Sequence, residues 1–357
     1  MKKVLIVSTV GLIYDGITSV ILSYLQAMNL DGLDIYVAGT IDVKPSIRKH
    51  IEECGCKIID FPNRRTNTGK YFLALSLFIK RNSIEVIHAH GNSGTLAIEM
   101  VAAWLGGCKK RIAHSHNTQC EQVKADKLLR PIFNRFYTEG LACGYAAGKW
   151  LFGDRMFKIL SNGRDIRKYI FNQEKRKVIR TSLGIKDEIV IGHVGGFYEQ
   201  KNHTFLVEIY RELRMLEPTC KLFMIGDGPL KDDIEKKCDG LDVSFTGTID
   251  DVSGYLNAMD GMILPSLFEG VPLVAVEWQI NGLPALMSDS ITRECILTNN
   301  ARMISLKATP KFWAEQMLVM IKENDRIISS KSACEFIKTT NYNIENNAEI
   351  LKKIYIG

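Results

Sequence analysis

The feature that most constrains the fold of this chain is an alternation of short β-branched runs with amphipathic stretches along its whole length. In the first half the run VLIVST precedes a helical pattern at residues 17–28, and the same order continues through DIYVAG, CKIIDF, EVIHAH and RIAHSH. After residue 180 the rhythm restarts with EIVIGHVG and runs on to PALMS. Strands that alternate with helices indicate βαβ units. The chain is therefore expected to be α/β, with two doubly wound parallel sheets in tandem.

The length supports two domains, because 357 residues exceed the ~100–200 residues of one typical domain. The polar, charged stretch 171–184 has no run that could join a core, so it is interpreted as a linker between domains 1–170 and 171–335. Residues 311–356 show helical spacing without strands and are expected to cap one domain or to lie across both. Ligands of open parallel sheets bind beyond the carboxyl ends of the strands, which predicts a site in a cleft between the two sheets.

The net charge of +6 conceals an uneven distribution. Residues 1–180 hold 28 basic and 15 acidic side chains, whereas residues 181–357 hold 18 and 25. A basic half can attract an anionic membrane, a phosphorylated substrate or nucleic acid, or it can simply be a solvated surface. Nucleic acid is not expected as a partner, because no recognisable nucleic-acid-binding module accompanies the basic residues.

Cysteine usage and hydropathy indicate a cytoplasmic protein. The nine cysteines are scattered, with no CxxC or Cys/His spacing, so reduced thiols and no structural zinc are expected. The apolar run after Met1 lacks a cleavage site and is interpreted as a first strand rather than a signal peptide. The longest other apolar run, Tyr71–Ile79, is too short to span a bilayer. The chain is expected to be soluble and at most peripheral to a membrane.

The strongest local motif is PSLFEGVPLVAVE at residues 265–277, directly after the apolar run GMIL. A strand, a turn and a helix starting near Pro272 would direct backbone N–H groups and the positive end of a helix dipole at one point, which favours an anion. Glu269 and Glu277 suit hydrogen bonds to hydroxyls, such as those of a sugar and a ribose, because ionised carboxylates only accept. A capping and a surface glutamate are the alternative interpretation.

At this point the sequence resembles a known family, the retaining glycosyltransferases of family 4, also called glycosyl transferase group 1. Glu269, seven residues and Glu277 match that family's Glu-x7-Glu motif, and the closest likeness is to bacterial exopolysaccharide and capsule enzymes. Further segments that carry the resemblance are GHVGGFYEQKNH (192–203), MIGDGP (224–229), FTGTIDD (245–251), IHAHGN (87–92), RIAHSHNT (111–118) and LSNGRDI (160–166). The resemblance implies the GT-B fold, two Rossmann-like domains facing across a cleft, with residues 336–357 as a helix returning to the N-terminal domain.

The resemblance also assigns roles in the second domain. Glu269 would contact hydroxyls of the donor sugar, and Glu277 would hold the nucleotide ribose. The backbone N–H groups implied to hold the diphosphate are those of Gly270, Val271 and Leu273. Lys201 matches the lysine that neutralises the diphosphate. One position departs from the family, which has Gly-Arg where this chain has Gly195-Gly196.

In the first domain, Gly16 matches the second glycine of the family's Gly-Gly turn near the diphosphate, and Asp15 replaces the first. His116 matches the histidine that contacts the donor sugar near the reacting carbon. Three more histidines are interpreted as satisfied surface residues: His88, His90 and His114.

The implied reaction moves a sugar from a nucleotide diphosphate donor, by resemblance a UDP-sugar, to a hydroxyl of a saccharide or lipid-linked oligosaccharide with retention of configuration. His116, Lys201 and Glu269 are the predicted catalytic residues. No metal and no cofactor are expected, since Lys201 and the helix terminus would supply the positive charge that Mg²⁺ supplies to a diphosphate in other enzymes. The acceptor in this family is often a lipid diphosphate, so a basic, partly apolar surface is expected to face an anionic inner leaflet. Its predicted residues are Lys124, Lys127, Arg130 and Arg135, near Leu128, Leu129, Ile132 and Phe133.

Three other functions were compared with this interpretation. A Rossmann dehydrogenase is disfavoured because no GxGxxG follows the first strand. A GT-B sugar-nucleotide epimerase shares the fold and the donor. A catalytically weak homologue that binds partners in a polysaccharide assembly complex is the non-enzymatic alternative, motivated by Gly196.

Overall fold

The computed structural model describes residues 1–249 and 251–357, which divide into two compact units. Unit 1 comprises residues 1–163 and 344–357, and unit 2 comprises residues 164–343. Residue 250, within the 245–251 motif, lies outside the described residues. None of the helices in the described part combines the length and apolar character needed to cross a membrane.

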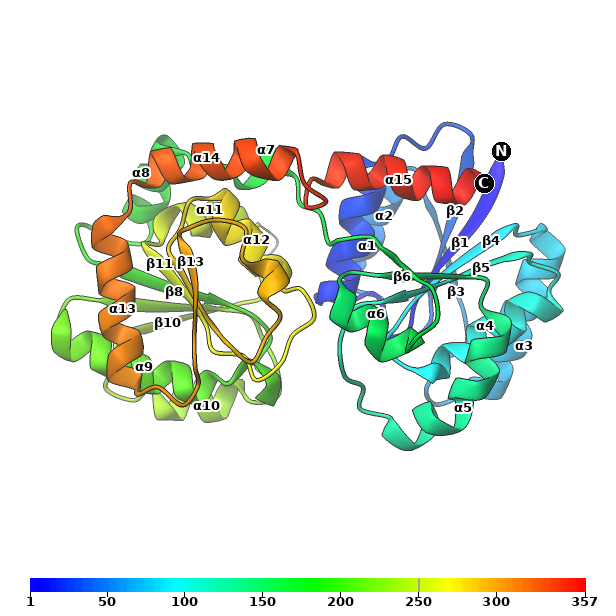
Figure 1. Ribbon diagram of the computed structural model, residues 1–357, viewed down its shortest axis with the longest axis horizontal. Coiled ribbons are helices and arrows are strands. Elements are labelled where there is room, and N and C mark those ends of the chain that lie inside the picture. Colours follow the sequence, from blue (N-terminus) through cyan, green and yellow to red (C-terminus); the bar gives the residue numbers. More distant parts are fainter. Residues whose placement is uncertain (250) are drawn as a thin grey trace. The chain divides into compact units, whose positions relative to one another are not determined.

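Over the described residues, unit 1 is built on a seven-stranded parallel sheet of order β3-β2-β1-β4-β5-β6-β7. The strands are β1 Lys2–Ser8, β2 Leu33–Gly39, β3 Lys57–Asp60, β4 Val86–His90, β5 Lys110–Ser115, β6 Glu139–Ala142 and β7 Lys158–Ile159. The helices are α1 Gly16–Ala27, α2 Pro45–Glu53, α3 Thr68–Asn82, α4 Ala97–Leu105, α5 Val123–Phe136, α6 Tyr145–Phe152 and α15 Ile344–Ile356, with a short 3₁₀ turn, η1 Gly94–Leu96. Figure 1 shows α1, α2 and α15 on one side of this sheet and α3, α4 and α5 on the other.

Unit 2 repeats the plan with a six-stranded parallel sheet over its described residues, of order β10-β9-β8-β11-β12-β13. The strands are β8 Val190–Val194, β9 Lys221–Ile225, β10 Val243–Gly247, β11 Gly261–Leu264, β12 Ala285–Ser288 and β13 Ala301–Ile304. The helices are α7 Ile166–Tyr169, α8 Gln173–Ser182, α9 His203–Leu216, α10 Lys231–Lys237, α11 Val252–Ala258, α12 Leu273–Ile280, α13 Pro310–Glu323 and α14 Arg326–Lys338, with 3₁₀ turns η2 Glu199–Lys201 and η3 Arg293–Cys295.

The central strands β8, β11 and β12 of unit 2 are buried on both faces, which explains their nearly continuous apolar runs. Ile191 and Ile263 point into a core with α9, α10 and α13, whereas the neighbouring Val190 and Met262 join a second core with α11, α12 and α14. Figure 1 shows these two helix layers on opposite sides of the sheet. The predicted fold class, two doubly wound parallel sheets, is confirmed.

The predicted linker is wrong. Residues 173–182 form α8, an amphipathic helix that belongs to unit 2, where Arg176 and Arg180 both pair with Asp260. Unit 2 begins after residue 163 rather than after the predicted 170, and it ends at residue 343 rather than at the predicted 335. A helix whose inward face is arginine has no apolar stripe, so its packing is not visible in the hydropathy pattern.

Candidate functional site

In unit 2 the strand order reverses between β8 and β11, and this switch point is where ligands bind in open parallel sheets. Lys201 lies in η2, in the segment that follows β8, and Glu269 lies in the turn after β11. Their side chains form an ion pair, with Lys201 Nζ 2.5 Å from Glu269 Oε1 and exposed fractions of 17% and 10%. The fold thus brings together two residues that the sequence analysis took from separate motifs.

The carboxylate of Glu269 is fixed from both sides. Gln200 Nε2 donates to Glu269 Oε2 at 3.0 Å and to the carbonyl of Phe268, and the Ser266 hydroxyl donates to Glu269 Oε1 at 3.1 Å. The backbone N–H of Leu267 donates to the Gln200 carbonyl, which ties the two loops together. A carboxylate held in this way is pre-organised, because little rotamer freedom remains to be lost when a ligand binds.

The glycine pair after β8 accommodates side chains from its own loop. A Cβ atom at residue 195 would lie 3.1 Å from Cε of Lys201, so the lysine side chain runs close against this backbone. A Cβ atom at residue 196 would lie 2.7 Å from Cε2 of Tyr198. The Tyr198 ring therefore occupies the position from which an arginine at residue 196 would have to start, which gives the departure at Gly196 a local reason.

The helix predicted near Pro272 begins at Leu273, with Pro272 as its N-cap. No side chain of the described residues caps this helix start, and Gly270 and Val271 are buried in the turn that leads to it. The first N–H groups of a helix lack intrahelical partners, and together with the dipole they favour an anion. Gly270, Val271 and Leu273 thus lie on the same segment as Glu269.

Glu277 lies in α12 and is buried. Its Oε1 is 2.7 Å from Nε of Arg164, whose side chain is only 2% exposed. Tyr169 lies near this carboxylate, and its pKa is raised, first by burial and then by the Glu277 charge. No role for Arg164 or Tyr169 is predicted from the sequence, although Arg164 lies in the LSNGRDI segment, because nothing local shows that Glu277 folds beside them.

Two histidines surround Lys201 and carry no charge at neutral pH. Burial lowers the pKa of His193 to about 4, and burial together with His193 and Lys201 lowers that of His203 to about 2. His193 Nδ1 donates to the Ile263 carbonyl at 2.8 Å, and His203 stacks on Phe197 with ring centroids 4.2 Å apart. The positive charge beside Glu269 is therefore that of Lys201 itself.

In unit 1, Gly16 is the first residue of α1, after β1. A Cβ atom at residue 16 would meet no atom within 4 Å, so the space beside this backbone is open. Asp15 is the N-cap of α1 and accepts a 2.8 Å hydrogen bond from the Thr18 N–H, and burial raises its pKa. Asp15 therefore has a capping role that a glycine side chain cannot perform.

The predicted surface positions of His88, His90 and His114 are wrong, since all three are buried. Residues 88 and 90 alternate along β4, and 114 and 116 alternate at the end of β5, so all four rings lie on one face of the sheet. This period-two spacing in two neighbouring strands was the signal that could have predicted the cluster.

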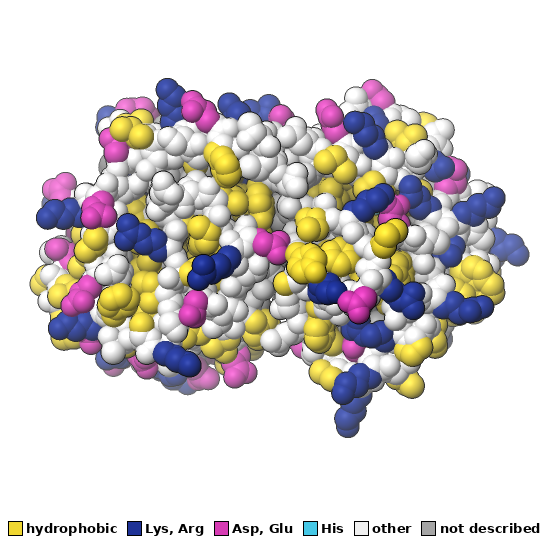
Figure 2. All heavy atoms as spheres, in the orientation of Figure 1, with side chains coloured by type: hydrophobic (Ala, Val, Ile, Leu, Met, Phe, Trp, Pro, Cys, Tyr) yellow, Lys and Arg dark blue, Asp and Glu magenta, His cyan; other side chains and the backbone are white. Residues whose placement is uncertain are grey.

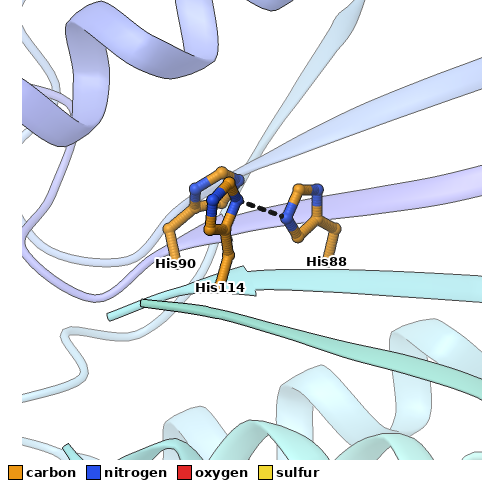
Figure 3. A group of neighbouring side chains, drawn as sticks. All are labelled: His88, His90 and His114. Carbon is orange, nitrogen blue, oxygen red and sulfur yellow. Dashed lines mark hydrogen bonds between the residues drawn. The ribbon is translucent and has the colours of Figure 1, made fainter. Parts of the chain in front are cut away.

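The four rings form two hydrogen-bonded pairs. His90 Nδ1 is 2.8 Å from His116 Nε2, and His88 Nε2 is 3.1 Å from His114 Nδ1, the contact drawn in Figure 3. His88 Nδ1 is 2.7 Å from the hydroxyl of Tyr355 in α15. Burial lowers the pKa of every ring in the cluster, that of His116 to about 3. The rings are therefore neutral, and His116 is oriented by His90.

Three of these rings, His88, His90 and His114, each have a nitrogen within 4.8 Å of the others, a spacing that could hold a metal ion. The nitrogens of His88 and His114 that face each other are already joined by a hydrogen bond, as Figure 3 shows. The described group has no carboxylate to balance a divalent charge. Hydrogen bonding between neutral rings accounts for the grouping, and the absence of a metal requirement stays a prediction.

The exposed residues of the basic surface on unit 1 differ from those predicted. Phe133 is fully buried, and Arg130 is held by Asp126 and the carbonyls of Trp150 and Leu151. The side chains of α5 that remain exposed are Val123, Lys124, Lys127, Leu128, Pro131, Ile132 and Arg135. In Figure 2, Lys and Arg side chains interspersed with hydrophobic ones cover the face of unit 1 and project where α5 lies in Figure 1.

Comparison with known proteins gives three kinds of finding. Residues 188–323 match the family model described as "Glycosyl transferases group 1". The putative glycosyltransferase EpsF of Bacillus subtilis is 32% identical over 303 residues, which cover 78% of this chain and 76% of EpsF. An Escherichia coli UDP-Gal:alpha-D-GlcNAc-diphosphoundecaprenol alpha-1,3-galactosyltransferase is 26% identical over 309 residues, covering 80% of this chain and 79% of that enzyme.

Solved structures share the architecture. The Anabaena protein HepE in complex with UDP and glucose superposes with a TM-score of 0.83 at 16% identity, and the alignment covers all of both chains. WaaG, a glycosyltransferase involved in lipopolysaccharide biosynthesis, gives a TM-score of 0.75 at 16% identity, again over all of both chains. At these identities the likeness supports the GT-B fold.

Proposed function

The chain belongs to the glycosyl transferases group 1 family, and on this premise we propose that it transfers a sugar from a UDP-sugar to a hydroxyl of a saccharide or lipid-linked oligosaccharide, with retention of configuration. The context proposed is the synthesis of a bacterial surface polysaccharide. UDP and a lipid diphosphate are suggested by the name of the E. coli relative, and UDP also by the ligand of the Anabaena structure.

The observation that carries the proposal is the Lys201–Glu269 pair at the switch point of unit 2, on the same segment as the uncapped start of α12. Lys201 and the N–H groups of Gly270, Val271 and Leu273 would stabilise the negative charge that develops on the departing diphosphate. Glu269 would accept hydrogen bonds from donor-sugar hydroxyls, and Glu277 from the ribose. The carboxylate needs no new orientation, since Gln200 and Ser266 already hold it.

Retention is proposed to follow from a front-face transfer, in which the leaving phosphate takes the proton of the acceptor hydroxyl. His116 and Gly16 of unit 1 are proposed to contact the donor sugar and diphosphate. His116 is neutral, so it can donate or accept a hydrogen bond at the sugar without a competing positive charge. We propose that the transfer needs no cofactor and no divalent metal, because Lys201 and the α12 amides supply the positive potential.

The proposal is tested by measuring binding of UDP, GDP and ADP to the purified chain by calorimetry, then UDP release from a UDP-sugar panel with and without a saccharide acceptor. Acceptor-dependent UDP release that persists in EDTA is the expected result, with the product anomer read by NMR. Failure to bind any of the three nucleotides contradicts the proposal. A strict need for a divalent ion contradicts only its metal-free part.

Gly196 favours one alternative, a weakly catalytic homologue that binds partners in an assembly complex, because no arginine can assist Lys201 from this position. Tight UDP binding without turnover on any donor would support that alternative. Release of a changed sugar nucleotide without acceptor would instead indicate an epimerase.

We further propose that α5 attaches the protein to the anionic inner face of the cell membrane. Its exposed lysines, arginine and apolar side chains suit the surface of an anionic membrane. Each basic residue near such a surface contributes about 1 kcal/mol to the free energy of binding. The triple variant K124E/K127E/R135E should therefore bind phosphatidylglycerol vesicles over 100-fold more weakly in a sedimentation assay. The matched control reverses three exposed lysines of unit 2, Lys175, Lys177 and Lys331. Equal binding by the two variants contradicts this surface.

A further inference from the structure

Glu277 and Arg164 form an ion pair that is almost completely enclosed. Their side chains are 7% and 2% exposed, and Arg164 Nε lies 2.7 Å from Glu277 Oε1. An ionised carboxylate is costly to bury unless a cation and hydrogen bonds compensate it. Arg164 supplies the cation here, from a position 113 residues earlier in the chain.

The carboxylate of Glu277 is an acceptor-only group. Its two oxygens offer about four lone-pair directions. Arg164 Nε lies 2.7 Å from Oε1, and the Glu277 charge adds to the burial that raises the pKa of Tyr169. The 2′ and 3′ hydroxyls of a ribose are donors that such a group can accept.

Arg164 is itself held by backbone that has no other part in the donor site. Its N–H donates to the Tyr342 carbonyl at 2.8 Å, and it forms a β-bridge with Asn343. Arg164 is the first residue of unit 2 and Asn343 is the last. The backbone of Arg164 therefore lies where both connecting segments leave the unit, and it is placed by the two ends of unit 2.

We infer that Arg164 is the positioning residue for Glu277, holding its carboxylate as an ionised, oriented acceptor for both hydroxyls of the nucleotide ribose. The inference rests on the proposed function, because it assumes that a nucleotide occupies the site. It adds a residue that the Glu-x7-Glu motif does not contain. Arg164 acts through Glu277 and touches no reacting atom.

The experiment compares the Kd of UDP with that of 2′,3′-dideoxy-UDP by calorimetry, using the full chain. A hydrogen bond to a charged group corresponds to about a tenfold to hundredfold preference for UDP. We expect such a preference in the wild type, a ratio near one in E277Q and R164Q, and an intermediate ratio in R164K. R164Q/E277Q should match E277Q, because both substitutions remove the same acceptor.

The ratio of the two Kd values is measured on the same variant. A general loss of stability weakens the binding of both nucleotides equally, so it leaves this ratio unchanged. The matched control is R176Q, which breaks a different ion pair of unit 2, Arg176 with Asp260 at 2.6 Å, and should leave the ratio unchanged. A wild-type ratio in R164Q, or in R164K if R164Q does not fold, overturns the inference while the proposed function stands. A wild type that does not bind UDP overturns both, and a wild type that binds both nucleotides equally overturns the ribose role of Glu277 together with the inference.

Discussion

At the scale of single residues, the Lys201–Glu269 ion pair has a consequence for ligand binding. Lys201 Nζ is engaged by Glu269 Oε1 at 2.5 Å. A diphosphate must compete with this carboxylate for the ammonium, and the two negative groups repel each other. The same glutamate is proposed to contact the donor sugar, so its effects on nucleotide binding and on transfer should differ in sign.

E269Q should therefore bind UDP as tightly as the wild type or several-fold more tightly, because Lys201 is released from its carboxylate partner. Its kcat should fall about 100-fold or more, because a neutral amide accepts weaker hydrogen bonds from the sugar. Calorimetry and a steady-state assay on one preparation give both values. A parallel loss of UDP affinity would contradict this role of the ion pair.

Residues of the site could be predicted where a local motif carries them. Lys201, Glu269 and Glu277 were found because each lies in a segment with a distinctive sequence. Arg164 was not found, because its importance depends on a partner distant in sequence.

At the scale of elements, the alternating apolar runs predicted most of the strands but not β6 or β13, and the start of α12 at Leu273 confirms the helix expected near Pro272. The boundary between the units was not predictable from composition, because α8 buries arginines against Asp260 instead of apolar side chains. The resemblance implied that residues 336–357 return to the first domain, and the structure places residues 344–357 in unit 1, where the hydroxyl of Tyr355 lies 2.7 Å from His88 Nδ1.

That last contact predicts a measurable effect of α15 on unit 1. Y355F keeps the ring and leaves a nitrogen of buried His88 without its phenol partner, which should cost about 1–3 kcal/mol of unfolding free energy. Urea denaturation measures the change, with Y198F as the control, since the Tyr198 side chain is more than half exposed. Equal stability of Y355F and the wild type would show that the hydrogen bond contributes nothing.

At the scale of the whole molecule, the structural boundary reduces the charge asymmetry. Unit 1 carries 23 basic and 15 acidic side chains, and unit 2 carries 23 and 25. The nearly neutral unit 2 thus presents a smaller barrier to a diphosphate than the sequence halves suggested. Seven of the basic residues counted in the first half lie between 164 and 180, in unit 2.

Six histidines make the stability of the molecule depend on pH: the buried His88, His90, His114, His193 and His203, and the partly exposed His116. Burial lowers the pKa of each below its ordinary value of 6.5. The unfolded chain therefore binds more protons below pH 6.5, so stability should fall as the pH drops from 7 toward 5, with a slope per histidine that rises to at most about 1.4 kcal/mol per pH unit well below pH 6.5. Urea midpoints across this range measure it, and H116Q should lower the proton uptake by about one. A flat profile would contradict the burial of neutral rings.

The central claim is that Lys201 stabilises the departing diphosphate in a sugar-transfer reaction. The most direct measurement is the acceptor-dependent rate of UDP release from the preferred UDP-sugar by the wild type, K201A and K221A. Lys221 is the matched control, because it forms a similar ion pair, 2.8 Å from Asp242, at the amino-terminal end of β9. We predict that K201A lowers kcat about 100-fold to 1,000-fold while K221A keeps the wild-type rate. A wild-type rate in folded K201A would contradict the account.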